Sequence, residues 1–533
     1  MLLATVLLLG ACKTLVESNY DDTDFFSLTA QTLASEIRDG KVSSFEATRQ
    51  YLQRIEEHDR SGARVQAIIS INPNALAVAE ERDQELAAGR VRGPLHGVPV
   101  LVKDNIETRE LPTTAGSLAL LENNTGRDAY LISKLRDAGA IILGKTNLSE
   151  WANFRSSNSI SGWSAVGGQT RNPYSLDRTA CGSSSGSAAA VAAGFAPIAI
   201  GTETNGSIIC PAAMNGIVGL KPTVGLVSRR HIVPLAPSQD SAGPMAKSVA
   251  DIAVMLNVLA GTDPKDAATV EADARLEDYT AALNRDIRNM RIGVFRWAQG
   301  DNEAVIAAFD RALETLQAQG VTLVEIKDFA PDPVMWNEGE NILLSQFHQS
   351  LDAYLATAAP SVTARTLKDL IEFNQQEADR ELRLFGQELF LSAVESRSAA
   401  GAEHKQVVMD IRQAAGENGI DKLLREHNVS VIAMPSTKPA YPVDVAFTSQ
   451  PSGAPTGATW LPAMAGYPVL SVPMGTHEGL PLGLMLTGTA WSDALILAVG
   501  HAYEKAAKVT LQPSFAESAL DVPETAEILR PLP

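Results

Sequence analysis

The chain has 533 residues, of which 45% are apolar and 20% are charged; these ordinary globular proportions exclude a disordered, collagen-like or coiled-coil protein as a description of the whole. Its length is sufficient to bury a large core and to leave a deep pocket. The net charge of −18 repels phosphate backbones, and no run of Lys and Arg forms a basic stripe, so nucleic-acid binding is not expected.

The first 12 residues, MLLATVLLLGAC, form an apolar run that ends in small residues, as in a secretory signal peptide. The end of this run, Leu9-Gly10-Ala11-Cys12, resembles a bacterial lipobox, and the run is too short to span a bilayer as a helix. We therefore expect residues 1–12 to direct export, to the periplasm or to a lipid anchor on Cys12 in the cell envelope. That anchor is the only membrane attachment we expect. No basic residue precedes the run, so an apolar tail on a cytoplasmic protein is the alternative.

From residue 29 onward, predicted helices and strands alternate, which is typical of an α/β fold. The predicted helices are residues 29–57 in two pieces split at Asp39-Gly40, with a capping-box spacing at Ser43 and Glu46, then 131–138, 188–193 and 302–319. The predicted strands are residues 98–102, 140–143, 197–201, 291–295 and 429–433, with further short strands through Leu486. Residues 303–430 are mostly helical and polar-faced, and we expect them to form part of the wall of a pocket.

The first segment with residues suited to catalysis ends at Lys103. This lysine follows the predicted buried strand at residues 98–102, where scarcity of water would favour its neutral amine. A surface lysine held in a salt bridge is the alternative interpretation.

The second segment lies in a stretch rich in Ser, Gly, Asn and Pro, residues 156–187. Because this stretch leads directly into a predicted helix and strand, a functional loop is favoured over a tether. Its part Cys181-Gly182-Ser183-Ser184-Ser185-Gly186-Ser187 contains GxSxG, with Ser184 in the nucleophile position of an α/β-hydrolase elbow. That elbow requires an apolar strand just before it, whereas residues 172–178 have the composition of a loop. A plain flexible loop remains the other alternative.

The third segment, Gly201-Thr202-Glu203-Thr204-Asn205-Gly206-Ser207, follows an apolar strand. Gly and Asn tolerate positive φ, so the turn can present successive backbone N–H groups inward. Such donors could stabilise an oxyanion beside the Ser207 hydroxyl. A tight structural turn is the alternative.

The three cysteines, Cys12, Cys181 and Cys210, are too few for a disulfide framework. We expect Cys181 and Cys210 to be small packing residues without a redox role. The eight histidines are scattered singly, without the spacing of metal ligands, so a zinc site is not expected.

Together the three segments that contain Lys103, Ser183 and Ser207 resemble the amidase signature family and, within it, bacterial peptide amidases. The resemblance runs from about residue 29 to about residue 510 and is most specific between Arg178 and Pro222. Further matching stretches are residues 144–150, 240–245, 465–468 and 480–483. The resemblance implies an α/β fold with one large amidase domain over residues 13–533. In that fold a mixed central β-sheet is covered by helices on both sides.

The resemblance also implies a Ser-Ser-Lys triad: Ser207 is the nucleophile, Ser183 the bridging serine, at a cis peptide bond, and Lys103 the base. A lysine pKa near 10.4 would have to fall by about three units for the neutral amine to act near pH 7, at a cost of about 4 kcal/mol. The implied oxyanion hole consists of the backbone N–H groups of Thr204, Asn205, Gly206 and Ser207. An amide would be hydrolysed through an acyl-serine intermediate, and no metal or organic cofactor is expected.

The sequence departs from the family pattern at three points around the nucleophile. Asn205 replaces the usual Gly, or the Asp of peptide-amidase relatives, and Glu203 replaces the commonest residue, Asp. In addition, Ile208-Ile209-Cys210 lacks the Arg that often follows the nucleophile. Without that Arg no partner for a substrate carboxylate adjoins Ser207, so we expect neutral amides as substrates, either peptide C-terminal amides or small aryl and aliphatic amides. Two other functions stay open: an A-type subunit of a tRNA-dependent amidotransferase, and a catalytically silent binding protein on the same fold. No residue pattern indicates an oligomeric state.

Overall fold

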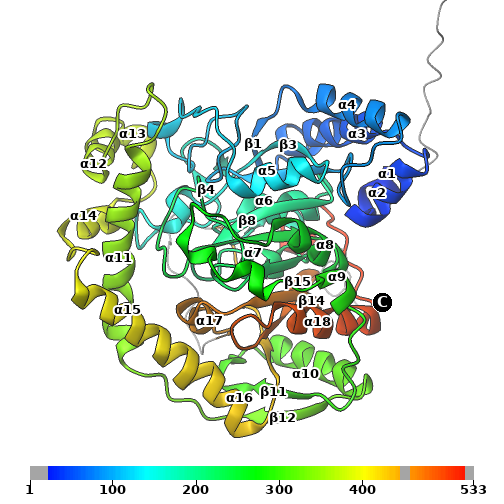
Figure 1. Cartoon of the computed structure of the whole chain (residues 1–533), viewed down its shortest axis with the longest axis vertical. Coiled ribbons are helices and arrows are strands. Elements are labelled where there is room, and N and C mark those ends of the chain that lie inside the picture. Colours follow the sequence, from blue (N-terminus) through cyan, green and yellow to red (C-terminus); the bar gives the residue numbers. More distant parts are fainter. Residues whose placement is uncertain (1–21, 444–455, 522–533) are drawn as a thin grey trace, which may run out of the picture.

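The computed structural model describes residues 22–443 and 456–521, so the expected export segment at residues 1–12 lies outside the described residues. A mixed sheet of 11 strands forms the centre, in the order β1-β3-β2-β8-β10-β9-β14-β15-β13-β11-β12 (Figure 1). Its strands are β1 (Ile68–Ile71), β2 (Pro99–Lys103), β3 (Ile141–Thr146), β8 (Ile198–Glu203), β9 (Val218–Lys221), β10 (Ser241–Ala246), β11 (Arg291–Phe295), β12 (Thr322–Ile326), β13 (Val431–Pro435), β14 (Val469–His477) and β15 (Leu480–Thr487). The mixed sheet confirms the expected fold class.

The middle of the sheet sets up the site. β2 runs parallel to both β3 and β8, with Val102 opposite Ile200. The carboxyl ends of parallel neighbours meet at one edge of a sheet, the usual place for a ligand site in an α/β protein. Lys103 at the end of β2 and Glu203 at the end of β8 therefore lie at the same edge.

Helices cover both faces of the sheet. The helices are α1 (Asp22–Ser27), α2 (Ala30–Arg38), α3 (Ser44–Ile55), α4 (Ala75–Ala87), α5 (Tyr130–Asp137), α6 (Ser185–Ala192), α7 (Ile209–Met214), α8 (Val249–Leu259), α9 (Tyr279–Ala282), α10 (Glu303–Ala318), α11 (Val334–Leu355), α12 (Leu367–Gln376), α13 (Ala378–Glu381), α14 (Glu388–Glu395), α15 (Ala402–Ala415), α16 (Asp421–His427), α17 (Trp460–Ala465) and α18 (Asp493–Ala507). Within the described ranges, none of them combines the length and the apolar character needed to cross a bilayer.

Neighbouring residues of β14 show which helices lie on which face, because successive side chains of a strand point to opposite sides. Leu470 packs against Gly500 of α18, whereas Ser471 lies beside Gly483 of β15, against Ala213 of α7. α8 and α10 pack beside α18, and α6 packs beside α7. The site loops thus lie on the face covered by α6 and α7.

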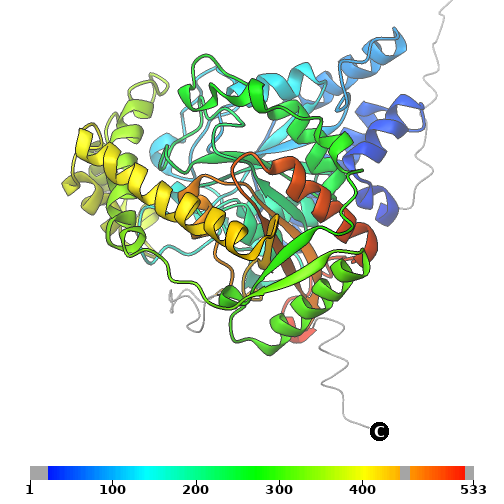
Figure 2. The same cartoon turned by 60° about the horizontal axis from the view of Figure 1, so that its bottom comes forward.

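Helices α11 to α15 form an arc beside these layers, at the left of Figure 1. Both views show α15, in yellow, leading from the arc back to the main body (Figures 1 and 2), where it packs against α17. This arc corresponds to most of the stretch that we predicted to be helical, residues 303–430.

The predicted helices at residues 29–57 are confirmed as α2 and α3, and Ser43 Oγ accepts a hydrogen bond from the Glu46 N–H at 3.0 Å. The stretch 303–430 is mostly helical, as predicted, and also contains β12, an edge strand in which only Ile326 is buried. One local prediction was wrong. The supposed loop at residues 172–178 contains most of a two-stranded hairpin, β6 (Arg171–Asn172) with β7 (Ser175–Thr179), and β4 (Trp163–Ser164) with β5 (Gly168–Gln169) forms a second one.

Candidate active site

Lys103 is delivered into the protein interior by β2, and its side chain is fully buried. Its Nζ lies 2.8 Å from Ser183 Oγ, 2.8 Å from Thr202 Oγ1 and 3.2 Å from the Thr202 carbonyl oxygen. No carboxylate of the described residues lies within ion-pair distance of this amine, whereas the equally buried Lys145 is paired with Asp104 at 2.8 Å. The structure thus excludes a surface salt bridge for Lys103.

The charge state of Lys103 follows from this environment. Burial lowers its pKa from the ordinary 10.5 to about 7, although the negative charges of Glu203 and Asp240 oppose the shift. Burial prevails because removing an ammonium ion from water disfavours its charged form. The Lys103 amine is therefore suited to accept a proton near neutral pH.

Ser183 lies in the loop between β7 and α6, and its side chain is fully buried. The Gly182–Ser183 peptide bond is cis, as the resemblance implied. The Ser149 N–H donates to the Ser183 carbonyl at 3.1 Å, which ties this loop to the segment that follows β3. The structure therefore places Ser183 in direct contact with Lys103.

Ser184, the candidate of the hydrolase-elbow interpretation, has a different role. Its Oγ donates to the Thr202 carbonyl at 3.0 Å and accepts from the Thr202 N–H at 3.2 Å. The strand before it, β7, belongs to a small hairpin rather than to the central sheet. Ser184 thus holds the loop against β8, and the elbow geometry is absent from this part of the structure.

Ser207 lies in the turn between β8 and α7 and is 8% exposed. Its carbonyl accepts a hydrogen bond from the Ser184 N–H at 3.0 Å, so the backbone joins the two serine loops directly. In the described residues the Ser207 and Ser183 hydroxyls are not hydrogen-bonded to each other. The structure thus gathers Lys103, Ser183 and Ser207 at one edge of the sheet, with only the first two in side-chain contact.

The turn that carries Ser207 is shaped by Gly206 and Glu203. Gly206 has φ +76°, a conformation that glycine adopts readily. Glu203 Oε2 accepts from the N–H groups of Ile208 at 2.7 Å and Ile209 at 3.0 Å. Along the described chain, no acceptor takes the backbone N–H groups of residues 204–207. The four groups that we predicted as the oxyanion hole thus have no backbone acceptor among the described residues.

Three further residues belong to this site but were not assigned roles from the sequence. Thr202 supplies two of the three contacts of Lys103, and Asn105 Nδ2 donates to Thr202 Oγ1 at 2.9 Å. Asp240 accepts from the Thr204 hydroxyl at 2.6 Å and so holds the far side of the turn. Thr202 and Asn105 belong to the sequence motifs that contain Ser207 and Lys103, and their position in these motifs could have indicated that they lie in the site.

A cavity of about 470 Å³ adjoins residues 202–204. Its apolar wall includes Leu148, Trp151, Ile232, Val233 and Leu235, and α11 contributes Phe347, Ser350 and Ala353. The predicted contribution of the helical stretch 303–430 to a pocket wall is thus confirmed. Within the described ranges, no three His, Cys, Asp or Glu side chains gather as metal ligands would.

Two arginines also line this cavity, and both are neutralised by carboxylates. Arg229 Nη2 lies 2.8 Å from Asp266 Oδ1, and Arg230 Nε lies 2.8 Å from Asp263 Oδ2. A third cation of the lining, Lys265, is exposed. Apart from the solvent-exposed Lys265, the described lining of the cavity presents mainly apolar surface and paired charges.

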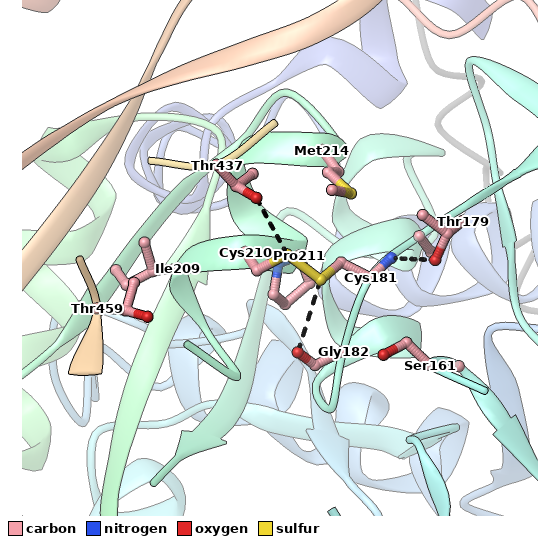
Figure 3. Close-up of a disulfide and its surroundings, with 12 residues drawn as sticks. Ser161, Thr179, Cys181, Gly182, Ile209, Cys210, Pro211, Met214, Thr437 and Thr459 are labelled. Carbon is pink, nitrogen blue, oxygen red and sulfur yellow. Dashed lines mark hydrogen bonds between the residues drawn. A yellow bond between two sulfur atoms is a disulfide. The ribbon is translucent and has the colours of Figure 1, made fainter. Parts of the chain in front are cut away.

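The expectation that Cys181 and Cys210 are separate packing residues is wrong, because they form a disulfide (Figure 3). The two cysteines are 29 positions apart in the sequence, and their Cα atoms are 6.0 Å apart. α6 and β8 lie between them in the chain and return it to the same edge of the sheet. Sequence spacing alone cannot reveal that return.

Comparison with known proteins identifies the family of the chain. The Amidase family profile matches residues 46–497, and the chain belongs to the amidase family. It is an enzyme that hydrolyses the C–N bond of carboxylic amides.

Individual relatives of the chain include peptide amidases, other amidases and amidotransferase subunits. The structure is similar to that of native peptide amidase from Stenotrophomonas maltophilia, with 46% identity, a TM-score of 0.87, and coverage of 92% of this chain and 99% of that chain. A protein of Arabidopsis thaliana described as a probable amidase is 35% identical over 499 residues, which cover 91% of each chain. The A-type subunit of glutamyl-tRNA(Gln) amidotransferase from Roseiflexus castenholzii is 37% identical over 507 residues, covering 91% of this chain and 96% of that protein.

Proposed function

We propose that Ser207, Ser183 and Lys103 are the nucleophile, the bridging serine and the base of this amidase. The observation that carries the proposal is the buried Lys103 amine, which contacts Ser183 and has no carboxylate partner in the described part of the chain. A neutral amine has two N–H donors and one lone pair. Two donors match the two oxygens of Thr202, and the lone pair can accept the Ser183 hydroxyl proton.

In this mechanism, Ser207 attacks the amide carbonyl while its proton passes to Ser183 and the Ser183 proton passes to Lys103. The backbone N–H groups of residues 204–207 stabilise the oxyanion that forms. The Lys103 ammonium then returns a proton through Ser183 to the leaving nitrogen, and water hydrolyses the acyl-Ser207 ester by the same route. The contact between the two serine hydroxyls closes when substrate binds, as catalytic hydrogen bonds commonly do.

The substrates that this site favours are neutral amides, and C-terminal amides of peptides in particular. Among the described residues that line the cavity, both arginines are paired with carboxylates, and the third cation, Lys265, is exposed to solvent. The similarity to peptide amidase at 46% identity points the same way. A substrate carboxylate next to the scissile amide would therefore lack a partner and would have to be desolvated.

The cavity has room for more than a single amino-acid amide. Pro237, Ser350 and Ala353 line both this cavity and a second hollow of about 520 Å³ between α11 and α15. The second hollow is mostly apolar and includes Val408 and Met409. The upstream residues of a peptide amide can follow this path away from Ser207.

The test is ammonia release from a panel of amides that differ in charge and length. We expect a tetrapeptide amide with apolar side chains to be hydrolysed faster than an amino-acid amide, and malonamide faster than malonamate. Met409→Glu should lower kcat/KM for the tetrapeptide amide alone. Leu391→Glu, on α14 and also exposed, is the matched control and should leave it unchanged. Faster turnover of malonamate than of malonamide would contradict the neutral-substrate proposal.

A second candidate is the A-type subunit of a tRNA-dependent amidotransferase. The 37% identity to a protein of this kind favours it, whereas the net charge of −18 opposes binding to tRNA. Co-purification with partner subunits and transfer of ammonia to aminoacyl-tRNA would establish this function. Steady turnover of free amides by the isolated chain would favour the stand-alone amidase, and it would also exclude a catalytically silent binding protein.

We also propose that the protein is exported and anchored by a lipid on Cys12. The apolar segment at residues 1–12 supports export, and so does the Cys181–Cys210 disulfide, because disulfides persist in oxidising compartments. Expression of the full chain in a bacterial host should yield a protein that incorporates labelled palmitate, and Cys12→Ser should abolish the label. An unprocessed N-terminus in the cytosol would contradict the proposal.

A further inference from the structure

The disulfide connects the two loops that carry the serines. Cys181 lies two residues before Ser183, and Cys210 lies three residues after Ser207. The bond therefore crosses directly between the β7–α6 loop and the first turn of α7 (Figure 3). Apart from it, the hydrogen bond from the Ser184 N–H to the Ser207 carbonyl is the direct backbone link between these loops in the described structure.

Each end of the disulfide is fixed to a residue that shapes its loop. Cys181 has φ +55°, a left-handed conformation that is unfavourable for a residue with a side chain. The surroundings must hold such a residue in place, and the Cys181 N–H donates to Thr179 Oγ1 at 3.0 Å. At the other end the Cys210 N–H donates to the carbonyl of Gly206, the neighbour of Ser207, at 2.8 Å.

The two cysteines of the disulfide differ in how deeply they are buried. Cys181 is buried in a small cluster with Tyr174, Met214 and Leu480. Cys210 is only partly buried, and Thr437 Oγ1 lies 3.9 Å from its Sγ. Cys210 is thus the more exposed of the two cysteines, and the lining of the substrate cavity includes neither of them.

We propose that the Cys181–Cys210 disulfide is a positioning element of the active site and that amidase turnover depends on its oxidised state. The proposal rests on the roles proposed above for Ser183 and Ser207. With the bond intact, the loop with the left-handed Cys181 and the turn with Gly206 move as one unit, and the proton path from Ser207 through Ser183 keeps its length. With the bond broken, the loops keep one backbone hydrogen bond and the side-chain links of Asn215, whose Nδ2 donates to the Ala180 carbonyl at 2.8 Å, and of Asn172.

The first experiment reduces the native enzyme. Dithiothreitol breaks the S–S bond by exchange: its two thiols are oxidised to a cyclic disulfide, and each cysteine sulfur gains one electron and one proton. We expect kcat for a peptide amide to fall by about 10- to 100-fold, the usual effect of a displacement of reacting groups by about 1 Å, while KM changes by less than about threefold. Reoxidation with oxidised glutathione should restore kcat. Thiol titration in guanidinium chloride, before and after, must show two thiols appearing and then disappearing.

The second experiment uses variants, in case the reductant fails to reach the bond. Cys181→Ala and Cys210→Ala should each show the lowered kcat of the reduced enzyme and no further response to dithiothreitol. Cys12→Ser is the matched control and should behave as the wild type. Circular dichroism should show that each variant is folded, and the activity assays should be run well below its unfolding temperature. A lowered kcat under these conditions reflects misplaced serines rather than loss of the fold.

The rate of fluorophosphonate labelling of Ser207 keeps this proposal separable from the proposed substrate. It should fall with reduction in the same proportion as kcat, and it can be measured even if no amide in the panel is hydrolysed. Two free thiols in fully active enzyme, or an unchanged kcat and labelling rate after verified reduction, would overturn the proposal. Labelling without hydrolysis of any amide would instead refute the proposed substrate and leave the positioning role to be judged on the labelling rate.

Discussion

The buried Lys103 amine should give amide hydrolysis a pH dependence that ordinary lysines do not produce. With its pKa lowered from 10.5 to about 7, about 90% of this amine is neutral at pH 8 and about 1% at pH 5. An unperturbed lysine would be only about 0.3% neutral at pH 8. Because the neutral form is the base, kcat/KM should be nearly constant above pH 8 and should fall about tenfold per unit below pH 7.

The assay is kcat/KM for a neutral peptide amide between pH 5 and pH 9, at constant ionic strength, for the wild type and Lys103→Arg. Arginine keeps a positive charge and hydrogen-bond donors but stays protonated throughout this range, so the variant should be inactive at every pH. Substantial activity of Lys103→Arg would show that the lysine acts through its charge and would refute the assignment as a base. A wild-type profile without a fall between pH 7 and pH 5 would refute it as well.

Three further predictions follow from the same contacts. Ser183→Ala should lower kcat by about 10²- to 10⁴-fold with little change in KM, because it interrupts proton transfer; ammonia release measures this, and a normal kcat would contradict the relay. Glu203→Ala leaves the Ile208 and Ile209 N–H groups without their acceptor, so both kcat and the free energy of unfolding should fall, the latter by about 1–3 kcal/mol; an unchanged denaturation midpoint would refute this. Lys103→Met should be inactive yet have a higher thermal midpoint. The lowered pKa of Lys103 reduces the free energy of unfolding of the wild type most below pH 7, and less as the pH rises from 7 to 10.5. The gain in thermal midpoint of Lys103→Met should therefore shrink with pH, and a gain that grew with pH would contradict the argument.

The elements around the site could be predicted because their signals are local. Five consecutive apolar residues before Lys103 indicate a buried strand wherever they occur, and β2 confirms it. The turn after β8 combines Gly206 with Asn205, which favours backbone conformations that expose N–H groups. In such places the residue types alone restrict the local structure.

What could not be predicted depends on which edges and loops meet in space. The Cys181–Cys210 disulfide joins loops 29 positions apart in the sequence, and the two contacts of Thr202 with Lys103 exist because β2 and β8 are parallel neighbours. β12 was missed for another reason: it lies at the edge of the sheet, where only Ile326 is fully buried. An edge strand of this kind lacks the alternation that identifies a half-buried strand.

The central claim is that Ser207 is the nucleophile of an amidase, and ammonia release tests it most directly. Wild type and Ser207→Ala should be compared on a peptide C-terminal amide, after circular dichroism has shown that both are folded. We predict steady release of ammonia by the wild type and a loss of at least about 10⁴-fold in the variant, because the acyl-serine intermediate cannot form without the Ser207 hydroxyl. Release by Ser207→Ala at a rate close to that of the wild type would contradict the claim.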